Sequence, residues 1–167
     1  MTTVIRWAAG TLVLGIAAGM AWLLLANPAR WEVTDAGTIL TEEGAKGRFA
    51  VIVSFVLIGI VASFLGGLIA GVRLRDRGWS LVPAFALTAL VAGIIAWQVG
   101  VVLGPPDPAT VTGTSVGDKI PQQLAVDSVT PFLVWPIFAL VGLLLAVYSA
   151  GDGGAKSASH RGEVVGS

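Results

Sequence analysis

The chain of 167 residues contains no cysteine and a single histidine. Disulfides, thiol redox chemistry and cysteine-ligated metal sites are therefore excluded in any compartment. The histidine, His160, lies in a tail rich in glycine and serine, where a solvated side chain is a better interpretation than a metal ligand. We accordingly expect no metal site and no cofactor.

Charge is also scarce. Charged residues make up 12% of the chain, roughly half the share that is usual in a soluble domain. Ten basic and ten acidic residues cancel, so no basic surface indicates a nucleic-acid partner. Hydrophobic residues account for 55%, and the mean hydropathy is +0.86. This composition predicts that the solvent of the chain is a lipid bilayer.

Four apolar segments are long enough to cross a bilayer, for which a helix needs about 20 residues. They comprise residues 7–26, 49–72, 81–103 and 132–148. None of them contains Asp, Glu, Lys or Arg. The first could instead be a cleaved signal peptide, but its apolar run exceeds the usual core of roughly 7–15 residues, so we expect a retained anchor. The predicted fold class is an all-α membrane protein with four transmembrane helices.

The second half of the chain repeats the first. Residues 7–25 align with 85–103, and 49–59 align with 132–142 after a short insertion. The identities continue into the loops, at Pro28/Pro106, Val33/Val111 and Thr34/Thr112. Loop matches are harder to attribute to chance than matches between apolar segments. We therefore predict two duplicated helix–loop–helix hairpins, related by an axis along the membrane normal.

The loops and the tail complete the predicted organisation. The loops 27–48 and 104–130 are long for simple turns, and their β-prone runs predict a small sheet. Within the second loop, residues 120–126 are compatible with a short surface helix. The polar tail, residues 150–167, is expected to be disordered. A transmembrane domain thus occupies residues 1–149.

Basic residues predict the orientation, because cytoplasmic loops carry an excess of Lys and Arg. Arg73, Arg75 and Arg77 form the densest group, in the short turn between the second and third segments. Both termini share that side and are predicted to be cytoplasmic, with both long loops extracytoplasmic. Tryptophans near the segment ends are typical of interfacial anchors. These are Trp7, Trp22, Trp79, Trp97 and Trp135.

Small residues recur every four positions along the apolar segments. The hydrophobic effect does not press helices together in lipid, so their association depends on close backbone approach at small residues. The predicted helix-packing positions are Gly15, Gly19, Gly59, Ser63, Gly67, Gly71, Ala92, Ala96 and Gly142. Whether they face the chain's own helices or a partner subunit stays open at this point. The longest stripe, in residues 49–72, is the candidate for a partner.

Catalytic groups are missing from the apolar segments. Ionisable side chains within a bilayer mark proton relays, ion paths and catalytic sites, and these segments hold none. The adjacent Glu42 and Glu43 are better interpreted as complementing the dipole of a helix that starts there. We predict no catalytic residue and no enzyme activity.

Two stretches, LGPPDPA (103–109) and PFLVWPIFALVGLLLAVY (131–148), resemble an actinobacterial family of small four-helix membrane proteins without an assigned activity. The resemblance covers about residues 5–148. It implies a multi-pass protein of the bacterial inner membrane and an accessory subunit of a larger envelope assembly. A Mce-type (mammalian cell entry) lipid importer is the assembly that we would name first.

The expected function is therefore that of a non-enzymatic accessory subunit, which packs laterally against a larger membrane complex such as a Mce-type importer of lipids or fatty acids. The alternative is a small homo-oligomeric transporter or channel. Its motivation is the duplication, and its weakness is the lack of a charged or strongly polar lining.

Overall fold

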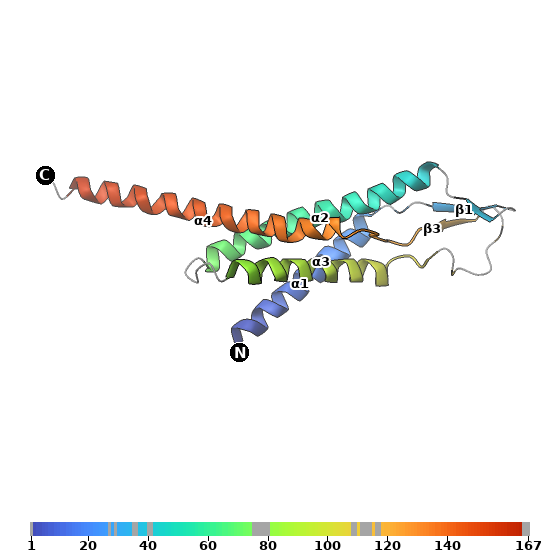
Figure 1. Ribbon diagram of the computed structural model, residues 1–167, viewed down its shortest axis with the longest axis horizontal. Coiled ribbons are helices and arrows are strands. Elements are labelled where there is room, and N and C mark those ends of the chain that lie inside the picture. The colour runs from blue at the N-terminus through green and yellow to red at the C-terminus, as the bar shows by residue number, and fades with distance from the viewer. Residues whose placement is uncertain are drawn as a thin grey trace.

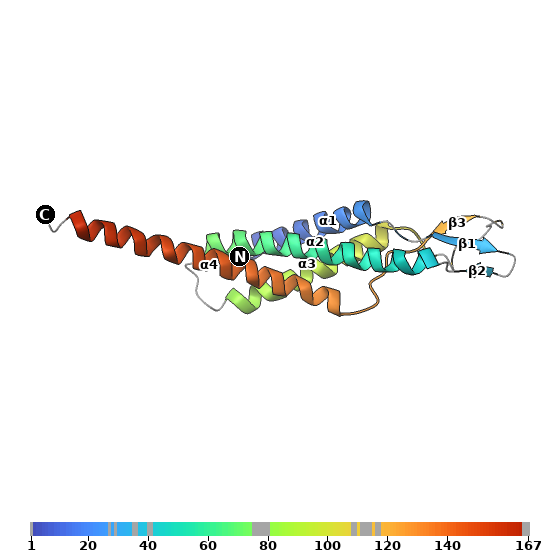
Figure 2. The same ribbon diagram turned by 90° about the horizontal axis from the view of Figure 1, so that it is seen from above.

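The computed structural model describes residues 2–26, 28, 30–34, 37–39, 42–74, 81–107, 110, 115 and 118–164. In these ranges the chain forms α1 (Thr2–Leu25), β1 (Arg30–Thr34), β2 (Gly37–Ile39), α2 (Glu42–Leu74), α3 (Leu81–Leu103), β3 (Lys119–Pro121) and α4 (Thr130–Val164). The helices follow one long axis (Figures 1 and 2), with the strands at one end and the C-terminal part of α4 extending from the other.

Three helices are long and apolar enough to cross a membrane. They contain the segments Lys46–Arg73, Val82–Leu103 and Thr130–Ser149. In α1 the apolar stretch among the residues whose side chains are described is Ala9–Leu25. The structure is helical, as predicted, and α2, α3 and α4 are compatible with a multi-pass membrane protein.

Two helices extend well beyond the predicted spans. Helix α2 begins at Glu42, where the adjacent acidic side chains favour a helix start. Helix α4 continues to Val164, so most of the segment predicted as a disordered tail is helical here. Extending an existing helix adds one hydrogen bond per residue without the cost of a new nucleus, and no proline follows Pro136 to stop it.

The helices pack in two main pairs, α2 with α4 and α1 with α3, while α3 also contacts α4. Helix α1 crosses the others at an angle, so its N-terminal end stands apart from them (Figure 1). Helix α1 therefore packs against the other helices in the half of the bundle nearer the strands and less closely in the opposite half.

A three-stranded antiparallel sheet in the order β2-β1-β3 combines strands from both long loops. In the centre, Glu32 of β1 is paired with Ile39 of β2 and with Lys119 of β3. The short helix predicted for residues 120–126 is wrong. Strand β3 takes residues 119–121, and an extended segment follows. Leu124 and Val126 are both buried, as the two-residue period of an extended chain allows.

Candidate functional site

Three large aromatic side chains lie at the centre of the bundle, in the half nearer the sheet. Trp22 on α1, Phe55 on α2 and Trp135 on α4 are each at most 1% exposed. The Phe55 ring contacts both indoles, with centroid distances of 5.0 Å to Trp22 and 5.9 Å to Trp135. The indole N–H of Trp22 donates a hydrogen bond to the carbonyl oxygen of Val51, 3.0 Å away. This cluster ties α1, α2 and α4 together at one level of the bundle.

The prediction that Trp22 and Trp135 anchor the chain at the membrane interface is therefore wrong. Both side chains are 0% exposed and cannot reach lipid head groups. Glycines on α3 make their burial possible. A Cβ at Gly100 would overlap the Trp22 ring, and one at Gly93 would lie 2.8 Å from the Trp135 ring. A glycine at the same level of the bundle as a tryptophan on another helix could indicate such a contact from the sequence. It does so only once the two helices are known to be neighbours.

The other predicted anchors and topology residues are placed only in part. Trp97 is partly buried, and its ring packs on Phe132 with centroids 5.9 Å apart. Arg73 is exposed near the end of α2. Outside the described residues, or described without their side chains, are Trp7, Arg75, Arg77 and Trp79.

The predicted packing glycines of α2 and α4 lie against each other's helix. A Cβ added at Gly67 would overlap the carbonyl oxygen of Ala139, and one at Gly142 would overlap that of Phe64. At Gly71 an added Cβ would lie 2.6 Å from the Cβ of Ala146. Backbone therefore meets backbone over about two turns, the kind of contact that small residues permit in lipid.

Helices α1 and α3 approach each other in the same way. A Cβ at Gly15 would lie 2.9 Å from the carbonyl oxygen of Ala92, and one at Gly19 would lie 2.7 Å from that of Ala96. Both alanines are buried. Gly59 faces the indole of Trp135, whose Nε1 would lie 2.6 Å from an added Cβ.

Ser63, the polar member of the predicted stripe, is buried, and its hydroxyl donates to the carbonyl oxygen of Gly59 at 2.5 Å. This bond within α2 satisfies the hydroxyl without a partner from another helix. The predicted packing positions therefore face the chain's own helices in the described part of the molecule. In the described part of the chain, the glycines of the α2 stripe are covered by α4 and offer no free groove to another subunit.

A cavity of about 830 Å³ lies at the end of the bundle away from the sheet, and all four helices line it. The cavity forms because only the second half of α1, nearer the sheet, packs closely on α3. Helices α2 and α4 are closest to each other at the end away from the sheet, where the first half of α1 stands apart from the other helices. Small residues in the lining, such as Gly10, Gly66 and Ala89, leave space between the helices. An added Cβ at Gly10 would meet nothing within 4 Å. The space is therefore open rather than filled by neighbouring side chains.

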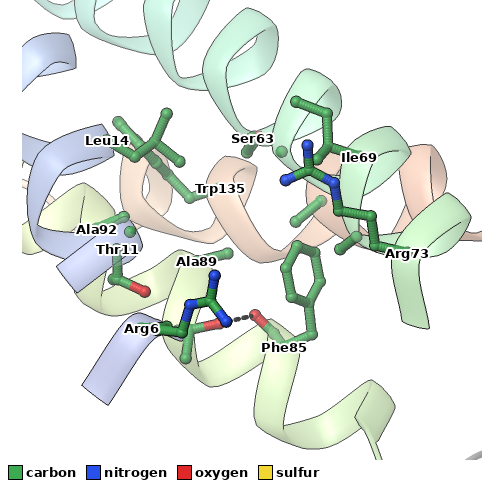
Figure 3. A pocket seen from close by; sticks show the side chains of 15 residues that line it. Arg6, Thr11, Leu14, Ser63, Ile69, Arg73, Phe85, Ala89, Ala92 and Trp135 are labelled. Atoms are coloured by element: carbon green, nitrogen blue, oxygen red, sulfur yellow. Dashed lines mark hydrogen bonds between the residues drawn. The ribbon is translucent and has the colours of Figure 1, made fainter. Parts of the chain in front are cut away.

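Among the residues that the structure describes, the charged side chains that line the cavity are those of two arginines. Arg6 comes from α1 and Arg73 from α2, and both are exposed. Figure 3 shows both side chains extending toward the cavity, with the ring of Phe85 on the α3 wall. Trp135 contributes to the lining from the interior of the bundle. The cavity thus has a positively charged rim and a largely apolar interior.

Two hydroxyl groups on the cavity wall, those of Ser63 and Thr88, are bonded within their own helices. Thr88 Oγ1 donates to the carbonyl oxygen of Phe85 at 2.8 Å, and Ser63 bonds to Gly59 as described above. Among the residues that the structure describes, no group of three or more His, Asp or Glu side chains is placed to hold a metal ion. The chemistry that this lining supports is binding of an apolar chain, with a negative charge at the rim.

No protein-family model, no curated protein and no solved structure matches the chain.

Proposed function

We propose that the protein is a non-enzymatic accessory subunit, held in the bacterial inner membrane by four helices and bound to a larger envelope complex. The observation that carries this proposal is the three-stranded sheet beyond the helix ends (Figure 2). Both long loops contribute to it, and in the described part of the chain β2 and β3 each pair only with β1. A membrane bundle that presents two strand edges on one side is suited to holding another protein.

Strand edges support partner binding because they carry backbone N–H and C=O groups that another strand can pair with. The helix faces support it less specifically. The glycines pack inside the bundle, and the outward faces carry large aliphatic side chains such as Val13, Leu24 and Leu133, which suit lipid as well as protein. We therefore infer that the sheet determines which partner is bound and that the helices add lateral contact.

The fourth span is α1. Its apolar part ends at Leu25, and its close packing on α3 at Gly15 and Gly19 supports a path through the same bilayer. The two main helix pairs, α1 with α3 and α2 with α4, are those that an axis between two duplicated hairpins would relate. The resemblance at residues 103–109 and 131–148 supports a Mce-type lipid importer as the complex.

Purification in mild detergent from native membranes is expected to recover stoichiometric partner proteins. Thr38→Lys should lower that recovery several-fold, because a lysine on an edge strand opposes strand pairing. Ser115→Lys is the matched control, an exposed position in a loop on the same side of the membrane but outside the strands. A lone monomer in repeated purifications of the wild-type protein would contradict the accessory role.

Single cysteines at Thr38, Ser115 and Ser159 test the topology, on a background that contains no other cysteine. With both termini in the cytoplasm, an impermeant thiol reagent should label intact cells at Thr38 and Ser115 but not at Ser159. The physical reason is the group of arginines at residues 73–77, which favours the cytoplasmic side. Labelling at Ser159 alone would reverse the orientation.

The alternative function is a small homo-oligomeric transporter or channel, and the cavity with its charged rim is the observation in its favour. The cavity lies at one end of the bundle, whereas the aromatic cluster fills the other half. Solute flux through proteoliposomes that contain only this protein would favour the alternative, since an accessory subunit alone transports nothing.

A further inference from the structure

We propose that the cavity binds one anionic phospholipid of the surrounding membrane, with the phosphate at Arg6 and Arg73 and one acyl chain inside the bundle. This rests on the membrane location in the proposed function but on no partner protein. Lipid binding and partner binding can therefore fail independently of each other.

The size of the cavity is the first argument. Protein interiors are close-packed, and voids larger than a water molecule are few. A space of about 830 Å³ lies within the range of roughly 300–1,000 Å³ that is typical of ligand-binding clefts. The space is open to the surface of the bundle, so in a bilayer the hydrocarbon of a neighbouring lipid can enter its apolar part.

The chemistry of the wall is the second argument. Leu14, Ile69 and Phe85 are large apolar side chains on three different helices, and Ala89 and Ala92 leave room between them. The hydroxyls of Ser63 and Thr88 bond to carbonyl oxygens of their own helices. A polar solute would thus find few hydrogen-bonding partners here, whereas an acyl chain needs none.

The charge at the rim is the third argument, and it selects an anionic lipid. In the described part of the chain, the side chains of Arg6 and Arg73 form no ion pair with a carboxylate and no hydrogen bond. Arginine binds phosphate through two parallel N–H groups, and basic pockets between membrane helices bind anionic head groups.

The depth of the two arginines fits this ligand. Arg73 is the last residue of the candidate span Lys46–Arg73, and Arg6 lies just before the apolar segment Ala9–Leu25. In the membrane arrangement proposed above, both guanidinium groups would lie at the boundary of the hydrocarbon layer, where lipid phosphates lie. A lipid whose phosphate stays at this level can place an acyl chain in the cavity without leaving its leaflet.

The test uses the purified full-length protein in detergent and measures bound lipid by native mass spectrometry. Dioleoyl phosphatidylglycerol should be retained and dioleoyl phosphatidylcholine should not. The double variant Arg6→Gln/Arg73→Gln should bind phosphatidylglycerol about tenfold more weakly or worse, since two attractive charges are lost. Arg48→Gln is the matched control, because Arg48 is an exposed arginine at the opposite end of α2.

Gly10→Leu separates the cavity from the charges. The new side chain fills part of the space and its Cβ meets no atom within 4 Å, so thermal stability without lipid should stay close to that of wild type while retention falls. Equal retention of both lipids, or retention unaffected by Gly10→Leu and by the double arginine variant, would overturn the proposal. Competition by glycerol 3-phosphate as strong as by the whole lipid would overturn it too, and would indicate a site for a free phosphate.

Photo-crosslinking locates the acyl chain. A phosphatidylglycerol that carries a diazirine near the end of one chain should label Leu14, Phe85 or Thr88, which line the cavity and are partly exposed. Labelling confined to outward-facing residues such as Leu87 or Val91 would indicate ordinary annular lipid and would refute a lipid inside the bundle.

Discussion

Replacing Gly67 with leucine is expected to separate α2 from α4 and to lower the stability of the bundle by about 3 kcal/mol, at the upper end of the usual cost of overpacking. The added Cβ would overlap the carbonyl oxygen of Ala139, which belongs to the helix backbone and cannot rotate away as a side chain does. The span should still insert, because leucine favours the membrane. Normal membrane abundance with a lower thermal transition in detergent is therefore the expected result.

Gly10→Leu is the control for Gly67→Leu. It introduces the same side chain into α1, where a Cβ would meet nothing within 4 Å, so its thermal stability should remain close to that of wild type. Equal stability of Gly67→Leu and wild type would mean that α2 and α4 do not touch at this glycine. A Gly67→Leu protein that stayed stable but lost its partners would indicate that the small-residue stripe of α2 faces a partner subunit.

Replacing Trp135 with alanine is the second change with a large expected effect, about 3–5 kcal/mol for removal of a buried aromatic ring. The ring lies over Gly59 and Gly93 and contacts Phe55, so three helices lose a shared contact at once. Unfolding by a denaturing detergent, followed by circular dichroism, would measure the loss.

Trp135→Phe and Trp135→Tyr distinguish a core residue from an interfacial anchor. The buried indole N–H of Trp135 has no hydrogen-bond partner in the described part of the chain, so phenylalanine removes no hydrogen bond. Tyrosine buries a hydroxyl, which costs about 1–3 kcal/mol if it is left unsatisfied. Phenylalanine should therefore be tolerated better than tyrosine. The opposite order is expected of an anchor at the head groups, and would contradict the burial of this side chain.

Local sequence information was sufficient to locate the helices. The segment predicted as 81–103 is α3 to the residue, and the other three apolar segments lie within α1, α2 and α4, apart from the last residue of the first. Length and hydropathy belong to one segment at a time, so no knowledge of its neighbours is needed. Hydropathy did not predict where α2 begins or where α4 ends. It marks the limit of an apolar segment, and both helices continue beyond that limit.

Whether Trp22 and Trp135 are buried or interfacial depended on the tertiary structure. Trp22 and Trp135 lie near the ends of their segments, where an interfacial ring and a buried ring leave the same sequence pattern. The deciding fact is that α3 brings Gly93 and Gly100 beside them, and a glycine far away in the chain is visible only when the helices are assembled.

The sequence by itself determined a helical chain made for a bilayer, with small residues placed for close helix contact and without cysteine chemistry. Only the tertiary structure decided that the glycines of α2 pack on α4 and Gly142 of α4 packs on α2. It also decided that Arg6 and Arg73 line one cavity. The physical reason is that hydropathy and residue size are properties of single segments. Packing partners, burial and cavities depend on how segments distant in sequence cross, and α1 crosses at an angle that leaves one end of the bundle open.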